Sequence, residues 1–124
     1  SAANNTSVVF CLEWRNWRLL FSGDAEQRSW KPIWKMMRGD TPLKPIHLLK
    51  VSHHGSHNGL PIADLLDEIM PEQPPDRRQR YAVVSTCLDT YNNVPDDATL
   101  TELGQRCAVR SVLDIPAGKF YFRT

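Results

Sequence analysis

The sequence predicts a single α/β domain, and three observations support this fold class. Short apolar runs alternate along the chain with longer segments in which apolar residues recur at helical spacing. Clusters of glycine, proline and asparagine separate these segments, as turns and loops require. The chain has 124 residues, 41% of them hydrophobic and 23% charged, which suits one domain spanning 1–124 with a buried core. We therefore expect a mixed sheet with flanking helices.

Two strands are expected at the start of the chain. Residues 8–14 and 17–21 read as strands, and Arg15-Asn16 between them reads as a tight turn. Both strands carry apolar residues on much of both faces. We therefore expect this hairpin to lie inside a layered fold.

The next helix is predicted from Trp30, Ile33, Trp34 and Met37, which recur at i, i+3, i+4 and i+7. Pro32 is tolerated only in a first turn, so the helix should begin near Ser29 or Trp30. Gly39 should end it.

The rest of the chain continues the alternation. His47 lies at the start of the next strand and is expected to be structural. The basic cluster Arg77-Arg78-Gln79-Arg80 is expected to be a solvated loop, with phosphate contact as the alternative. The expected elements are a strand at 46–51, a helix from Pro61 to Pro71, a strand at 81–85, a helix capped by Asp96 or Asp97, and strands at 109–113 and 119–122.

Two stretches carry residues suited to chemistry, and each directly follows an apolar run. Asp24 lies in Phe21-Ser22-Gly23-Asp24-Ala25-Glu26, and His53, His54 and His57 lie in Val51-Ser52-His53-His54-Gly55-Ser56-His57. Ligands of open α/β sheets bind at the carboxyl ends of strands. A carboxylate and an imidazole at two such ends are the parts of a metal site. The alternatives are a helix cap for Asp24 and a polar turn for the histidines.

These two stretches resemble motifs of the metallo-β-lactamase superfamily of hydrolases. Gly23-Asp24 is similar to its Gly-Asp element, and Val51-Ser52-His53-His54-Gly55-Ser56 is similar to its last histidine motif. The resemblance is closest to the branch found in DNA-uptake competence proteins. It implies that the chain is the C-terminal half of an αββα sandwich.

The resemblance also implies roles for the site residues. Asp24 would bridge two zinc ions, with manganese as the alternative metal, and His54 would be a terminal ligand. His53 would orient the loop or contact the leaving group. His57 and Asn92 are candidates for substrate contact, although a solvent-facing turn is the stronger expectation for His57. In the branch's Asn-x-Tyr-Gly-His-Pro element, Val94 replaces the histidine here, which weakens the nuclease interpretation.

The superfamily's His-x-His-x-Asp-His motif, which supplies most of the metal ligands, does not occur in this sequence. We expect the chain alone to be inactive and to hold little or no metal. It would be part of a metal-dependent hydrolase acting on a phosphodiester or another ester or amide. The alternative is a non-catalytic interaction or regulatory module. In both cases a missing N-terminal half, or a partner chain, is expected to cover the first strands.

Charge and composition exclude some other classes. The net charge of +1 argues against a dedicated nucleic-acid-binding arm. Cys11, Cys87 and Cys107 form neither a zinc motif nor a disulfide framework. The sequence contains no run of membrane-spanning length and no signal peptide pattern, and a cytoplasmic location is expected.

Overall fold

A computed structural model describes residues 8–40, 43–52, 55, 59–61, 63–85 and 96–111 of the chain. The elements run in the order β1 (Phe10–Trp14), β2 (Trp17–Phe21), α1 (Gln27–Arg38), β3 (Leu48–Lys50), α2 (Ala63–Ile69), β4 (Tyr81–Val84), α3 (Asp97–Gly104) and β5 (Ala108–Ser111). The α/β class and the mixed sheet are confirmed. The predicted strand at 119–122 lies outside the described residues.

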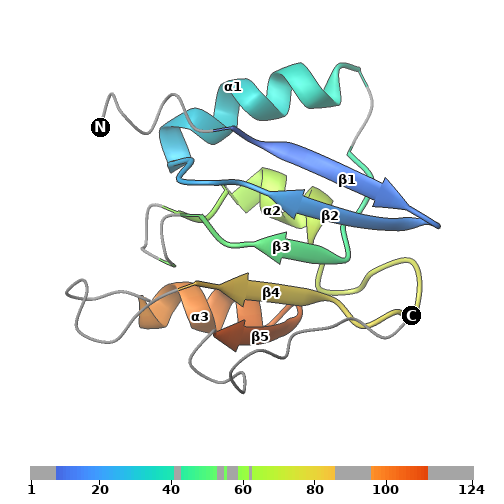
Figure 1. Ribbon diagram of the computed structural model, residues 1–124, viewed down its shortest axis with the longest axis vertical. Helices are drawn as coiled ribbons and strands as arrows, with labels where there is room; N and C mark the ends of the chain where they lie inside the picture. The colour runs from blue at the N-terminus through green and yellow to red at the C-terminus, as the bar shows by residue number, and fades with distance from the viewer. Residues whose placement is uncertain are drawn as a thin grey trace.

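The five strands form one sheet in the order β1-β2-β3-β4-β5 (Figure 1). β1 and β2 are an antiparallel hairpin, whereas β2, β3, β4 and β5 are parallel neighbours. Arg15 and Asn16 join the hairpin with φ angles of 47° and 66°. This is the type I′ geometry that suits the strand twist, so the predicted tight turn is confirmed even without glycine.

The three described helices pack on one face of the sheet. A right-handed crossover between parallel strands places its helix on a fixed side, and here each crossover advances the sheet in the same direction. The strand register lines up Leu20, Leu49, Ala82 and Val109 on that side. These residues belong to or pack against the core cluster that also holds side chains of α1, α2 and α3. Figure 1 shows α2 and α3 behind the strands.

The opposite face of the sheet, which we call the bare face, is covered by none of the described helices. It begins at β1, where Phe10, Leu12 and Trp14 are about half exposed at 51%, 51% and 53%. All five residues of β1 are exposed. The expectation that the hairpin lies inside a layered fold is therefore wrong for this chain by itself, because β1 is an edge strand and no described element packs over its apolar side.

Helix α1 begins earlier than the sequence predicts. The Glu26 carbonyl accepts from the amides of Ser29 (2.8 Å) and Trp30 (3.2 Å), so Pro32 lies inside the helix rather than in its first turn. The proline has no amide to bond the carbonyl four residues earlier, that of Arg28, and this residue is exposed to water. Gly39 ends the helix as predicted, with a φ of 55° and its amide donating to the Lys35 carbonyl.

The other two helices follow the predicted patterns closely. α2 buries Leu65, Leu66 and Ile69. α3 begins after Asp96, whose carboxylate accepts from the amide and hydroxyl of Thr99, and this confirms the predicted cap. Cys107 lies beyond the end of α3, where burial raises the pKa of its thiol to about 11. None of the helices in the described ranges is long and apolar enough to cross a bilayer.

Candidate metal centre

The two motifs leave neighbouring parallel strands at the same edge of the sheet. Leu20 is paired with Leu49 and Phe21 with Lys50, so β2 and β3 end level with each other. Both stretches therefore directly follow strands, as the sequence predicts, and the structure shows that the two strands are neighbours. β4 ends at the same edge, where its Val83 carbonyl accepts from the Val51 amide at 2.9 Å.

Two serines connect the strand ends directly. Ser22 and Ser52 each follow their strand, and both are almost completely buried, at 0% and 1% exposure. The Ser22 hydroxyl donates to the Lys50 carbonyl at 2.6 Å, and the Ser52 hydroxyl donates to the Ser22 hydroxyl at 2.5 Å. Sequence reasoning missed this contact. Its only signal is that both serines occupy the same position after an apolar run.

Asp24 lies in an exposed turn immediately after the serine contact. Gly23 supplies a φ of 54°, and the Ala25 amide donates to the Ser22 carbonyl at 3.0 Å, so the chain reverses tightly here. The alternative role of Asp24 as the cap of α1 is wrong, because the N-cap residue is Glu26. Glu26 contributes its carbonyl to the helix start, and its carboxylate lies 3.4 Å from Arg28.

Lys50, the last residue of β3, is a cation at this edge of the sheet. Burial lowers the pKa of its amine, and the Asp24 carboxylate acts in the opposite direction. Its ammonium donates to the Val51 carbonyl at 2.9 Å. Asp24 and Lys50 therefore attract each other at this edge of the sheet.

The loop after β3 is fixed at one described point. Gly55 has a φ of 81°, its amide donates to the Ser52 carbonyl at 3.0 Å, and its carbonyl accepts from the Asp96 amide at 2.8 Å. These bonds join the histidine stretch to the start of α3. His53, His54, His57 and Asn92 lie outside the described residues, so the roles assigned to them stay predictions.

The fourth histidine lies at the opposite end of the strands, as the sequence predicts for a structural residue. His47 is 1% exposed. Its Nδ1 accepts from the Arg18 amide at 3.0 Å, and its Nε2 donates to Asp76 at 3.2 Å. Burial lowers the pKa of His47 despite the neighbouring carboxylate. The ring is therefore neutral and held in one tautomer.

The basic cluster near Arg80 is not a uniformly solvated loop. Arg80 is only 2% exposed, pairs with the Asp76 carboxylate and donates to the Ile46 carbonyl at 3.3 Å. Arg78 lies over the ring of Trp17 at 4.6 Å. The expectation of a solvated cluster is wrong for Arg80, because Asp76 and the Ile46 carbonyl hold it in a buried position, whereas Arg78 is exposed as expected.

The donor chemistry at the carboxyl edge suits zinc or manganese but does not complete a site. The Asp24 carboxylate is an appropriate oxygen ligand. Within the described ranges no group of three histidine, cysteine, aspartate or glutamate side chains is close enough to hold a metal ion. Catalytic zinc normally has three protein ligands, so Asp24 needs partners from the histidine stretch or from outside this chain.

Comparisons with family models, with characterised proteins and with solved structures find no match to this chain.

Proposed function

We propose that this chain is the C-terminal half of a metal-dependent hydrolase that cleaves a phosphodiester or another ester or amide bond. The observation that carries the proposal is the parallel register of β2 and β3. It brings the Gly23-Asp24 turn and the start of the histidine stretch to one edge of the sheet. That placement is what a shared metal site requires of motifs about 30 residues apart.

Each residue has a distinct role in this proposal. Asp24 would hold both metal ions through its carboxylate, His54 would be a terminal ligand, and His53 would position the loop or contact the leaving group. His57 and Asn92 are candidates for substrate contact. A pair of zinc ions, when bound, would lower the pKa of a bridging water so that hydroxide is available near neutral pH.

The bare face supports the proposed αββα sandwich. In that architecture two sheets pack face to face about 10 Å apart, with helices on the two outer sides only. This chain has helices on one side and half-exposed Phe10, Leu12 and Trp14 on the other. A missing N-terminal half would bury these side chains and would also supply the remaining metal ligands.

The test is a set of alanine variants in the parent protein that joins this chain to a His-x-His-x-Asp-His segment. With a chromogenic phosphodiester as substrate, Asp24→Ala should reduce hydrolysis to background, because two cations would face each other without a bridging carboxylate. Asp40→Ala, which removes an exposed acid after α1, is the matched control and should keep full activity.

The histidines should then rank by their distance from the proposed ions. His54→Ala should lose bound metal and most of the rate, His57→Ala should do less, and His47→Ala should lose stability only. Equal loss of activity in His47→Ala and Asp24→Ala, with metal and fold retained in both, would contradict the placement of the site.

The isolated chain offers a second test. It should bind zinc or manganese weakly in a calorimetric titration and should not turn over the substrate, because three ligands are not available. Stoichiometric metal that survives gel filtration, together with turnover, would show that the site is complete without another half.

The second candidate function is a non-catalytic interaction module, and the bare face is the observation that favours it. Such a module would use the apolar side of β1 and β2 to bind another chain, with no need for the metal. A parent protein that lacks metal-dependent activity on every ester tried would make this the better interpretation.

A further inference from the structure

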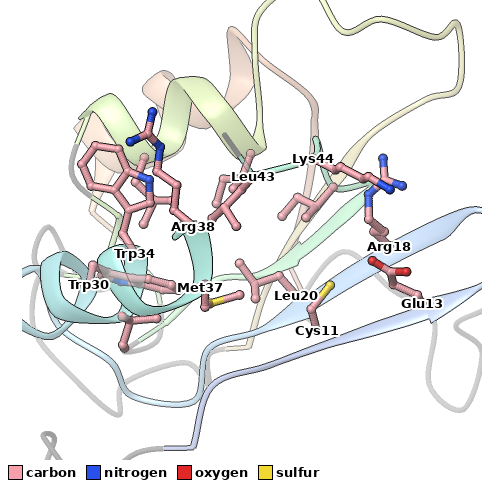
Figure 2. Close-up of a pocket in the computed structure, with 14 residues that line it drawn as sticks. Cys11, Glu13, Arg18, Leu20, Trp30, Trp34, Met37, Arg38, Leu43 and Lys44 are labelled. Carbon is pink, nitrogen blue, oxygen red and sulfur yellow. The ribbon is translucent and has the colours of Figure 1, made fainter. Parts of the chain in front are cut away.

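A cavity of about 270 Å³ lies between helix α1 and the β1–β2 hairpin, away from the proposed metal centre. Side chains of β1, β2, α1, α2 and the segment before β3 line it (Figure 2). Its volume is roughly twice the ~150 Å³ of an apolar cavity that binds benzene. The cavity is therefore large enough for a small organic molecule.

One end of the cavity is apolar and its wall is firmly held. Trp30 is 1% exposed and lies there with Trp34 and Met37, as Figure 2 shows. Glu68 of α2 fixes this wall, because its carboxylate accepts from the Trp34 indole at 2.9 Å and from the Leu43 amide at 3.2 Å. Glu68 thereby ties helix α1 and the segment before β3 to α2.

The other end of the cavity carries charge. Arg18, Lys44 and Glu13 gather there in Figure 2. Glu13 and Arg18 face each other across the hairpin, and the Arg18 Nε donates to the Pro45 carbonyl at 2.7 Å, beside Lys44. Two cations and one acid leave this end net positive.

The fourth charged residue of the cavity is already neutralised. The Arg38 Nε lies 2.9 Å from the Glu68 carboxylate. Lys44, in contrast, has no ion-pair partner among the residues whose positions are described. The cation available to a ligand is therefore at the Arg18–Lys44 end, opposite the tryptophans.

We propose that this cavity binds an amphipathic monocarboxylate, with its hydrocarbon part against Trp30 and Trp34 and its carboxylate at Arg18 and Lys44. The shape and the charge distribution both favour this class. A neutral hydrocarbon would leave the two cations unused, and inorganic phosphate would leave the apolar end empty. A guanidinium fork is well suited to hold a carboxylate. The site is independent of the proposed hydrolase activity.

The direct test is a calorimetric titration of the 124-residue chain with hexanoate, octanoate and decanoate. Each added methylene should tighten binding about fourfold until the cavity is full, since burying a methylene is worth ~0.8 kcal/mol. Octanol is the neutral counterpart of octanoate and should bind at least about tenfold more weakly. Equal affinity for octanol and octanoate would overturn the proposal.

Variants locate the binding site. Lys44→Gln should weaken octanoate binding about tenfold, whereas Lys31→Gln, on an exposed part of α1 outside the cavity, should leave it unchanged. Met37→Trp places a bulky indole ring in the cavity, so octanoate binding should be lost. The Met37 side chain is 40% exposed, so the fold should tolerate the larger residue. Circular dichroism of each variant checks the fold.

The bare face could also adsorb amphiphiles, and a further variant separates the two sites. Leu12→Ser reduces the apolar area of that face and should leave octanoate affinity unchanged. Weakening by Leu12→Ser, or unchanged affinity in either Lys44→Gln or Met37→Trp, would show that the carboxylate binds elsewhere and would overturn the proposal.

Discussion

The two ends of the parallel strands differ in the burial and the charge of their polar groups. At the amino end, His47, Asp76 and Arg80 form a buried or half-buried network in which each charge or ring nitrogen has a protein partner. At the carboxyl end, the buried contact among the described residues joins the uncharged hydroxyls of Ser22 and Ser52 to the Lys50 carbonyl, and the acid Asp24 lies exposed beyond them. The amino end is built for stability, and the carboxyl end keeps an ionisable group accessible to ligands.

This difference between the two ends predicts a graded response to substitution. Removing a group from the amino-end network should leave a buried partner without a hydrogen bond, which lowers the free energy of unfolding. Removing an exposed group from the carboxyl end should cost little stability and affect only function. Stability-neutral residues with strong functional effects are therefore expected at one end alone.

The largest loss of stability should come from Arg80→Ala. It removes a buried side chain and leaves the Ile46 carbonyl without this partner, while the half-exposed Asp76 keeps His47, so the free energy of unfolding should fall by about 3–4 kcal/mol. Urea denaturation measures this. Arg78→Ala is the matched control, because it removes an exposed cation above Trp17 and its exposed hydrogen bond to the Asn16 carbonyl, together worth about 0.5–1 kcal/mol. Similar losses in the two variants would contradict a special role of the amino-end network.

His47→Ala should cost about 2–4 kcal/mol, since it leaves a cavity and removes both ring hydrogen bonds. The Arg18 amide would lose its acceptor, and Trp17 would lose the ring whose centroid lies 4.9 Å from its own. A loss below about 1 kcal/mol by urea denaturation would mean that the ring is not needed at this position.

The same histidine should make stability depend on pH. Burial lowers the pKa of His47 in the folded chain below its unfolded value of about 6.5. Below that pH the unfolded chain binds the extra proton more readily, so the free energy of unfolding should decrease as the pH falls through about 6.5 and be fully restored above it. In His47→Ala this part of the pH dependence should disappear. If the free energy of unfolding of His47→Ala changed with pH between 7 and 5 as steeply as that of the unaltered chain, the pH dependence would belong to other groups.

Ser22→Ala should have an intermediate effect of about 1–2 kcal/mol. It removes the hydroxyl that donates to the Lys50 carbonyl and accepts from Ser52, and leaves the Ser52 hydroxyl without that partner. Ser29→Ala, in the first turn of α1, is a less buried comparison. In the parent protein Ser22→Ala should also lower metal affinity, because the Asp24 turn begins at this residue.

Asp24→Ala should have the smallest effect on stability, within about 0.5 kcal/mol, because the side chain is exposed and does not cap α1. This prediction sharpens the comparison with Arg80→Ala: a nearly unchanged urea midpoint together with lost metal binding would mark Asp24 as a functional residue. A large loss of stability would place it among the structural ones.

Much of the fold follows from local sequence patterns. The apolar runs gave most of the strands to within two residues, the helical spacing gave α1 and α2, and Gly39 and Asp96 marked a helix end and a helix start. These features depend on neighbours within a few positions along the chain. The adjacency of the Asp24 and histidine stretches was also predictable, because both follow strands of a sheet.

The features that the sequence did not reveal depend on distant partners. The burial of Arg80 requires the Ile46 carbonyl, 34 residues away, and the Ser22–Ser52 contact requires the register of two strands 30 residues apart. The exposure of β1 depends on which elements cover the sheet, and an apolar strand has the same pattern whether it is covered or not. Pro32 inside α1 depends on Arg28 being open to water, which compensates the carbonyl that the proline leaves unbonded.

The strictly sequential strand order has a consequence for how the chain folds. Among the described strands, each of β2 to β5 pairs with the strand that precedes it in the sequence, so each new unit can dock on a template that has already formed. Only the β1–β2 pairing is local; the three parallel pairings join residues 29, 33 and 27 positions apart and are expected to form more slowly. Within this chain the β1–β2 hairpin, with its two-residue turn, precedes the other described strands and would offer them the growing edge. Assembly would then proceed in one direction, from β2 toward β5, with each helix closing over the strand pair beneath it.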